Sequence, residues 1–419
     1  MTRTPAADDR VILPPGPADA SGDRADARPD RAPAPSERFR RALRRAAPAL
    51  YGYALTRVAL LGLLAVRGGP HRAVTRLASD WDATWYARIV RHGYAGHSGL
   101  FNAHGMEYSA RAFFPLFPAL AAPLNRALPV SAGVALLIVA WVSGLVAAWG
   151  VYACGAFTGS RRAGVVAAVL WGVLPLAAVE SMAYSESLFT ALAAWSLYAA
   201  LRRRWIWAGG LCLLAGLVRP NAMALTGAIG VAALVQLYRW RRAGTAPADW
   251  WRPLVGALLS PLGWLGYMLW TAWAERSWTA YFHIQDAWGS SFDGGLSTLR
   301  WVAALSSPYD HGRGDSTTNL MIAATVLAYL VLWACTLRQR QPLVLVLFST
   351  LLLAMDLGNS SPYPPLARFL IPAFPLLFPL AERLARIPRR WVLAALLAVL
   401  ALLSGYHGTD VVFFGGAPA

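Results

Sequence analysis

Lysine is absent from the 419-residue sequence, and charge of either sign is scarce. Arginine supplies all 38 basic residues, only 21 residues are acidic, and charged residues make up 14% of the chain. Ordinary soluble domains contain about 25% charged residues. The low charge therefore excludes an ordinary soluble domain and indicates a membrane protein.

Cysteine is also rare, and the three cysteines do not have the spacing of a disulfide-bonded or zinc-binding domain. Cys154, Cys212 and Cys335 each lie inside an apolar run, and no CxxC spacing occurs. This excludes a disulfide framework and a cysteine zinc cluster. The seven histidines show no HExxH-like spacing, so we expect neither a metal nor another cofactor.

Long apolar runs dominate what the sequence does contain, with 57% hydrophobic residues and 19 tryptophans. A transmembrane helix needs about 20 apolar residues. The sequence predicts an all-α polytopic membrane protein with about eleven spans. The number is uncertain by two, because several runs are short and 113–124 is either a further span or an interfacial segment. The predicted spans are 48–66, 131–157, 164–180, 187–201, 205–219, 221–238, 252–274, 319–337, 342–356, 368–384 and 391–406.

The distribution of arginine predicts the topology. If the N-terminus lies on the cytoplasmic side of the cytoplasmic membrane, the spans place five short arginine-containing loops in the cytoplasm, as the positive-inside rule requires. These loops are "SRR", "RRR", "RWRR", "RQR" and "RLARIPRR". Because topology accounts for the net charge of +17, we expect no nucleic-acid partner. The sequence predicts a disordered cytoplasmic tail over 1–46, a transmembrane domain over 47–406 and a short extracytoplasmic tail over 407–419.

Two long loops, 67–130 and 275–318, fall on the outer side and carry many Trp, Tyr and His residues. Long loops on one face commonly carry function. Nucleotide sugars are not available outside the cytoplasm, so group transfer there requires a membrane-linked donor. A sugar on a polyprenyl phosphate meets this need, and its transfer requires a carboxylate base for the acceptor hydroxyl and cations for the leaving phosphate.

The stretch "SDWDATWYARIVRHGY", residues 79–94, is the first candidate for this chemistry. We expect Ser79 to cap a helix that ends before Gly93, with Asp82 and Trp85 on one interfacial face. Ser79 and Asp82 also match a capping box, in which Asp82 serves only the helix start. Asp80 and Asp82 formally match a metal-binding Asp-x-Asp motif, although the soluble domain that normally carries this motif is absent.

Two arginines are candidates for the donor phosphate. "LVRPNA" places Arg219 at the outer end of one predicted span, and "ARFLIPAF" places Arg368 at the outer end of another. A guanidinium near hydrocarbon is costly and usually functional, and its planar fork matches phosphate. The alternative is that each arginine is an anchor that snorkels to the interface.

Polar and aromatic residues in the outer segments are candidates for binding the sugar. "AYSESLF" contributes an acid and a tyrosine at an outer turn, and "AYFHIQDAWGSSF" presents a polar and aromatic helix face that an interfacial belt would also explain. The predicted substrate-binding residues are Trp81, Trp85, Tyr86, Tyr184, Glu186, Asn221, Gln285 and Trp288.

Six motifs in one order resemble the PIG-V-type mannosyltransferase family of GT-C glycosyltransferases. They are "WDATWYARIVRHGY", "FFPLFPAL", "YSESLF", "RPNA", "FHIQDAWG" and "ARFLIPAFPLLF", and they extend over roughly residues 50–385. The resemblance implies a GT-C-type bundle whose two extracytoplasmic loops carry interfacial helices. It also implies metal-independent, inverting transfer of mannose from polyprenyl-phosphate mannose to a glycolipid or glycan acceptor.

The resemblance also ranks the two aspartates. The family's Trp-Asp falls on Trp81 and Asp82, so Asp82 is the favoured base and Asp80 the second choice. The sequence departs from the family in having Asp80 where a basic residue often precedes the Trp-Asp pair. It also has Ala367-Arg368-Phe369 where Pro-Arg-Tyr is common.

Two other classes remain as alternatives. A lipid or glycolipid flippase would also be polytopic and contact membrane lipid, but transporters usually carry internal repeats and charged or broken helices at the membrane midplane. A membrane assembly factor would need no carboxylate cluster. The charge at the outer ends of the spans favours the enzyme.

Overall fold

The computed structural model describes residues 35–304, 316–360 and 367–414, and most of these residues are helical. Residues 45–419 form one compact unit, and the description below concerns that unit. Helix α1 (Pro35–Gly68) begins before it. Residues 35–46, which the sequence assigned to the disordered tail, are therefore helical, and residues 1–34 lie outside the described part.

The helices vary widely in length. The first half of the chain forms α2 (Pro70–Ser79), α3 (Asp82–His92), η1 (Ala110–Ala112), α4 (Leu116–Ala127), α5 (Ala132–Thr158), α6 (Arg161–Trp171), η2 (Ala177–Ser181), α7 (Glu186–Leu201) and α8 (Trp205–Gly216). The second half forms α9 (Ala222–Ala243), α10 (Trp251–Leu259), α11 (Leu262–Glu275), α12 (Ala280–Ala287), α13 (Leu296–Ala304), α14 (Ser316–Arg338), α15 (Leu343–Leu357), η3 (Ala367–Leu370), η4 (Phe374–Leu377), α16 (Phe378–Ala385) and α17 (Arg390–Phe413).

Among the described residues, five helical segments are long and apolar enough to cross a membrane: Ser36–Gly68, Ala132–Thr158, Ala222–Ala243, Trp251–Glu275 and Arg390–Phe413. Shorter apolar helices cover Trp205–Gly216, Ala323–Arg338 and Leu343–Leu357. The all-α polytopic fold is confirmed, and most predicted spans coincide with helices. Helix α17 continues to Phe413, so the first part of the predicted outer tail is helical.

Besides 205–219, which forms the 12-residue α8, three apolar runs do not form long helices. The run 164–180 becomes α6, a turn and η2, and the run 368–384 becomes η3, η4 and α16. Pro175 interrupts the first, and Pro372, Pro375 and Pro379 interrupt the second, because proline lacks the N–H that an interior helical position donates. The third run, 113–124, contains α4, whose 12 residues reach only about 18 Å of a roughly 30 Å core.

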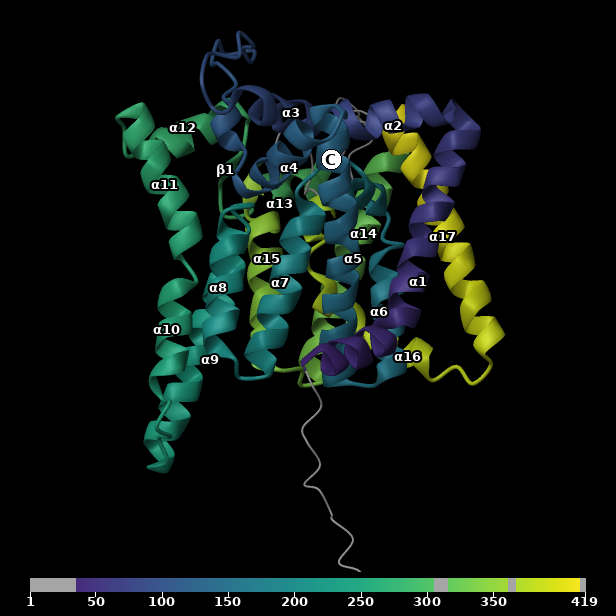
Figure 1. Cartoon of the computed structure of the whole chain (residues 1–419), viewed down its shortest axis with the longest axis vertical. Coiled ribbons are helices and arrows are strands. Elements are labelled where there is room, and N and C mark those ends of the chain that lie inside the picture. Colours follow the sequence, from purple (N-terminus) through teal and green to yellow (C-terminus); the bar gives the residue numbers. More distant parts are fainter. Residues whose placement is uncertain (1–34, 305–315, 361–366, 415–419) are drawn as a thin grey trace, which may run out of the picture. The chain divides into compact units, whose positions relative to one another are not determined.

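The longer helices run back and forth between two ends of the unit, with α10 and α11 forming one continuous segment, and this separates the loops into two sets (Figure 1). The arginine-rich turns join α5 to α6, α7 to α8, α9 to α10, α14 to α15 and α16 to α17, and they all lie at one end of the helices. At the opposite end, α2, α3, α4 and α12 lie across the ends of the longer helices (Figure 1). Strands β1 (Ser291–Phe292) and β2 (Asn359–Ser360) pair antiparallel and connect the second long loop to the end of α15.

Glycines allow α8 to approach α10 and α11 at backbone distance. A Cβ added at Gly209 would lie 2.3 Å from the carbonyl oxygen of Gly256, and one added at Gly263 would lie 1.8 Å from that of Leu213. Small residues at helix interfaces permit this approach in membranes, where packing replaces the hydrophobic effect between helices.

We predict that Gly263→Ala destabilises the protein by about 3 kcal/mol or more, the upper end of the usual cost of overpacking, because its methyl group would overlap backbone atoms. The matched control is Gly266→Ala in the same helix, where an added Cβ meets nothing within 4 Å. We expect Gly266→Ala to be neutral or slightly stabilising. Unfolding in mixed detergent micelles measures both, and equal stabilities for the two variants would contradict the packing described.

Candidate active site

The turn between α2 and α3 places Asp82 at the start of a helix. Helix α2 ends at Ser79, whose hydroxyl donates to Thr75 O at 2.7 Å, and α3 begins at Asp82. The predicted cap by Ser79 and the capping-box alternative are both wrong, because no side chain caps the N-terminus of α3. Gly93 ends the helix, as predicted, with a φ of 66°.

Trp81 connects the two helices in a backbone conformation that is unusual for a side chain with a Cβ. Its φ of 49° and ψ of −115° lie outside the regions that residues other than glycine normally occupy. Such residues cluster at functional sites, where the surrounding structure holds them. Here Trp81 packs half-buried against the core, and the turn directs Asp82 toward η3.

Asp80 interacts with α2 and not with α3. It is the C-terminal cap residue of α2, and its backbone N–H donates to Arg76 O. Its carboxylate accepts a hydrogen bond from Arg76 Nη1 at 3.0 Å. Asp80 therefore closes α2 through a local ion pair, whereas the carboxylate of Asp82 contacts a distant part of the chain.

Four charged side chains form a continuous chain of ion pairs, which we call the charge chain: Asp82, Arg368, Glu186 and Arg219. Arg368 Nη2 donates to Asp82 Oδ2 at 2.6 Å, and Arg368 Nε lies 3.2 Å from Glu186 Oε1. Arg219 Nη1 lies 2.5 Å from the same Glu186 oxygen. Residues from α3, η3, the start of α7 and the α8–α9 turn thus meet at one point.

Glu186 is the centre of the charge chain. Its side chain is 1% exposed, the two arginines are 11% exposed, and Asp82 is 21% exposed. Glu186 lies in the first turn of α7, where the positive end of the helix dipole stabilises a carboxylate. The two positive and two negative groups neutralise each other, which makes their burial tolerable.

The charge chain leaves several hydrogen-bonding atoms free. With respect to the described residues, Nε and Nη2 of Arg219, Nη1 of Arg368 and Oδ1 of Asp82 form no hydrogen bond or ion pair. Within the described part of the chain, two cations and one carboxylate oxygen thus keep hydrogen-bonding capacity at the same place.

Aromatic rings support both guanidinium groups. Arg219 lies 5.1 Å from the centroid of the Phe369 ring, and Arg368 lies 5.2 Å from that centroid and 5.1 Å from that of Tyr184. Contacts of this kind stabilise cations that have lost water. Phe369 is a residue that the sequence did not single out, although it stands in the quoted "ARFL" motif.

Ser185 is a second residue that the sequence analysis missed. Tyr86 OH donates to Ser185 Oγ at 2.8 Å, and Arg219 Nη1 donates to the same oxygen at 3.3 Å. Burial raises the pKa of Tyr86, so this phenol is a neutral donor. Ser185 therefore joins α3 to the charge chain, and its place between Tyr184 and Glu186 in "YSES" was the available signal.

An aromatic cluster lies on the α3 side of the site. Trp85 stacks on Phe113 at 6.0 Å and meets the edge of Trp288 at 5.1 Å, and Tyr108 lies 4.8 Å from Trp288. Gln285 Nε2 donates to Tyr281 OH at 2.9 Å. The two long loops that the sequence predicts to be outer thus meet through rings, and the predicted residues Trp85 and Trp288 are neighbours.

The predicted site residues fall into three groups. Asp82, Arg368, Glu186 and Arg219 form the charge chain, and Tyr184 and Tyr86 contact its members or Ser185. Trp85 and Trp288 belong to the aromatic cluster, beside which Gln285 binds Tyr281. Asp80, Trp81 and Asn221 form no described contact with the charge chain; Asn221 is half-buried at the N-cap position of α9.

A loop next to α12 is ordered around one acid. Glu107 accepts from Gly99 N–H at 3.0 Å and contacts His97 and Ser98, and these contacts lower its pKa to about 2. Asn102 in the same loop donates to Ala287 O at 2.9 Å. The loop is therefore held against the end of α12.

No group of three or more possible metal ligands occurs within the described residues. The formal Asp-x-Asp pair is also divided, since Asp80 pairs with Arg76 and Asp82 with Arg368. The two carboxylates therefore serve different partners.

Comparison with known proteins identifies the fold. The structure of ArnT from Cupriavidus metallidurans bound to undecaprenyl phosphate is similar over 87% of this chain and 75% of that chain, with a TM-score of 0.51 and 14% identity. The oligosaccharyltransferase of Archaeoglobus fulgidus in its apo form aligns over 87% of this chain and 56% of its own, with a TM-score of 0.49 and 13% identity. No family model and no curated protein matches the sequence. The chain is an all-α membrane protein with a GT-C-type fold.

We predict that Glu186→Gln lowers the free energy of unfolding by about 3 to 5 kcal/mol, because it leaves two buried arginines with one carboxylate between them. Adding Arg219→Gln restores part of that loss, since the unpaired cation is then removed. The double-mutant cycle is measured by unfolding in bicelles.

The exposed pair Arg252–Asp249, at 3.0 Å with side chains 53% and 47% exposed, supplies the control. Asp249→Asn should cost less than about 1 kcal/mol. Strictly additive losses at Glu186 and Arg219 would show that the two residues are not coupled.

Proposed function

We propose that the chain is an integral-membrane glycosyltransferase that moves mannose from a polyprenyl-phosphate donor to an acceptor hydroxyl with inversion. The observation that carries the proposal is the charge chain, in which, among the described residues, a carboxylate with one unpaired oxygen stands beside two arginines with unpaired N–H groups. A transfer from a lipid phosphate needs this combination: a base for the incoming hydroxyl and cations for the leaving phosphate.

The position of the site supports a lipid-linked donor. The charge chain lies at the end of the helices opposite the arginine-rich turns. The positive-inside rule places those turns in the cytoplasm, and the site then faces the extracytoplasmic side of the cytoplasmic membrane. Nucleotide sugars are absent there. The ArnT structure with a similar fold contains undecaprenyl phosphate, which is a carrier of the class required here.

Arg219 and Arg368 bind the donor phosphate in this proposal. Glu186 holds both guanidinium groups through one oxygen and leaves Nε and Nη2 of Arg219 and Nη1 of Arg368 for the ligand. Because Asp82 and Glu186 already neutralise the arginines, an added phosphate gives the site a net negative charge. The departing phosphate is therefore held by directed hydrogen bonds more than by excess charge.

Asp82 acts as the base. Arg368 fixes its Oδ2, so Oδ1 is the oxygen that accepts the proton of the acceptor hydroxyl. The hydroxyl oxygen forms a bond to the anomeric carbon as the bond from that carbon to the phosphate oxygen breaks on the opposite face. The proton passes to Asp82, and the electron pair leaves with the phosphate.

The sugar lies against the aromatic cluster in this arrangement. Trp85 and Trp288 present ring faces and edges, and Gln285 with Tyr281 supplies hydrogen-bonding groups beside them. Trp81, Tyr86 and Tyr184 complete the site from the α2–α3 turn and from the segment before α7. Asn221, at the start of α9, is assigned to the same surface from its "RPNA" motif.

Mannose is the sugar that the resemblance to PIG-V-type enzymes favours, and a glycolipid or glycan is the acceptor. All six motifs of that resemblance supply residues to the charge chain or to the rings beside it. The two arginines occupy the role that a divalent cation has in other transferases, so the proposed reaction requires no metal.

We predict that Asp82→Asn lowers transfer by about 10² to 10⁴-fold, the usual contribution of a general base. Asp80→Asn is the matched control and should retain most of the activity, because Asp80 only closes α2. Release of polyprenyl phosphate from radiolabelled polyprenyl-phosphate mannose is measured in the presence of EDTA, with a glycolipid extract as acceptor.

Two results of this assay would contradict the proposal. Loss of activity in Asp80→Asn with retention in Asp82→Asn would transfer the role of base to Asp80. Absence of release by the wild-type protein from every lipid-linked sugar, together with movement of the lipid across vesicle membranes, would favour a flippase.

A further inference from the structure

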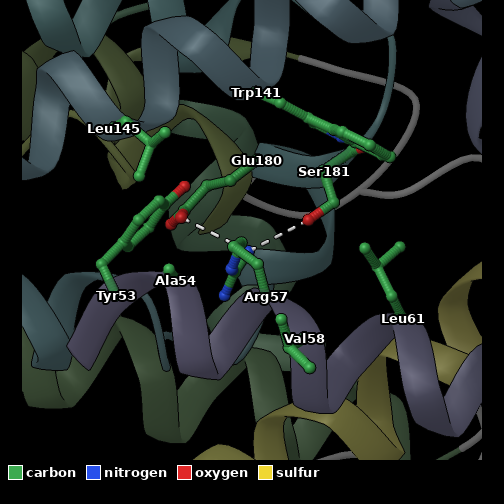
Figure 2. A pocket seen from close by; sticks show the side chains of 9 residues that line it. All are labelled: Tyr53, Ala54, Arg57, Val58, Leu61, Trp141, Leu145, Glu180 and Ser181. Atoms are coloured by element: carbon green, nitrogen blue, oxygen red, sulfur yellow. Dashed lines mark hydrogen bonds and ion pairs between the residues drawn. The ribbon is translucent and has the colours of Figure 1, made fainter. Parts of the chain in front are cut away.

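A pocket of about 180 Å³ opens between α1 and α5, away from the charge chain (Figure 2). Its rim is apolar and includes Val58, Leu61, Trp141 and Leu145, of which Val58 is 64% and Leu145 41% exposed. Both helices are long enough to span a membrane, so exposed side chains between them face hydrocarbon.

The floor of the pocket is polar. Glu180 and Ser181 extend from η2 toward Arg57, and Tyr53 lies beside them (Figure 2). Arg57 Nη1 lies 3.4 Å from Glu180 Oε2. An ionisable pair at a membrane-facing position is costly and is usually functional. None of these residues belongs to the charge chain.

The donors of Arg57 are already engaged by the protein. Its Nη2 donates to Gly172 O, its Nη1 donates to Ala177 O and to Ser181 Oγ, and its Nε donates to Thr56 Oγ1. The guanidinium therefore holds the turn between α6 and η2 in place. Among the described residues these bonds use four of its five N–H groups, and Glu180 neutralises its charge, so the pocket favours an uncharged ligand over a phosphate.

In contrast to the donors of Arg57, the carboxylate oxygens of Glu180 have few partners. Its side chain is fully buried, and its Oε2 lies 3.4 Å from Arg57 Nη1. The Tyr53 hydroxyl lies beside it, but neither oxygen has a hydrogen bond of good geometry among the described residues. A buried carboxylate oxygen without a donor is expensive. The open group in the pocket is thus an acceptor, and the missing partner is a donor.

We propose that this pocket binds a membrane lipid through a neutral hydroxyl, which donates to Glu180 while the lipid's chain lies on the apolar rim. The hydroxyl fits better than an ammonium group, because Arg57 and Glu180 already neutralise each other and an added cation would be unpaired in the membrane. The pocket is much larger than one water molecule needs, and its rim matches an alkyl chain.

The test uses the purified full-length protein in phosphatidylcholine nanodiscs. One probe is a long-chain alcohol with a diazirine near its hydroxyl, and the matched probe is its phosphate monoester. After irradiation and digestion, mass spectrometry locates the labels. We expect the alcohol to label the peptides around Tyr53 and Trp141 about fivefold more than the phosphate ester does, a ratio that corresponds to one hydrogen bond.

Two variants separate binding in the pocket from labelling at the protein surface. Leu145→Trp fills the pocket and should abolish the labelling, whereas Leu55→Trp, on the lipid-exposed side of α1 and outside the pocket, should not change it. Glu180→Gln should reduce the preference for the alcohol. A diacylglycerol probe in a parallel arm distinguishes a glycerolipid hydroxyl from a simple lipid alcohol, and labelling by either supports the proposal.

The proposal is overturned if the alcohol and the phosphate ester label equally, or if Leu145→Trp labels like the wild-type protein. Water would then be the partner of Glu180. Because the readout is covalent labelling, these outcomes do not depend on whether the chain transfers a sugar.

Discussion

The carboxylate of Glu186 is the interaction on which the rest of the site depends. It is almost completely buried and is shared by Arg219 and Arg368 through one oxygen. Without it, two cations would face each other in a poorly hydrated interior, which is strongly unfavourable. The pairing draws three separate segments of the chain together, and Arg368 extends it to Asp82. The ion pairs that neutralise the buried arginines are therefore the same contacts that bring these arginines and Asp82 together in the candidate site.

The irregular segments of the fold make this convergence possible. If residues 164–180 and 368–384 formed continuous helices, fewer irregular segments would lie near the charge chain. Prolines divide both runs instead. The resulting η2 and η3 segments carry Glu180 and Arg368 at buried positions. Non-helical backbone at this depth is tolerated where it is enclosed by protein. The α2–α3 turn, with its unusual Trp81 conformation, has the same role for Asp82.

Much of this arrangement could be predicted from the sequence. Hydropathy and arginine-rich turns predicted most helices and placed Asp82, Glu186, Arg219 and Arg368 at one end. Glu186, Arg219 and Arg368 lie at the ends of apolar runs, and Asp82 lies in the long loop after the first run. The prediction that Ser79 caps α3 was wrong, because the capping pattern does not reveal that a preceding helix, α2, ends at Ser79. Ser185 and Phe369 were missed, because their importance comes from tertiary contacts with Arg219. The different roles of Asp80 and Asp82 also depend on tertiary structure, because Asp82 meets the distant Arg368 whereas Asp80 pairs with Arg76 in its own helix.

The most direct test of the account is a cryo-electron microscopy structure of the wild-type protein in nanodiscs with bound polyprenyl phosphate. The account predicts that phosphate oxygens lie within hydrogen-bonding distance of Arg219 and Arg368, with Asp82 Oδ1 facing the same space. A phosphate bound elsewhere, with the charge chain closed and unoccupied, would contradict it.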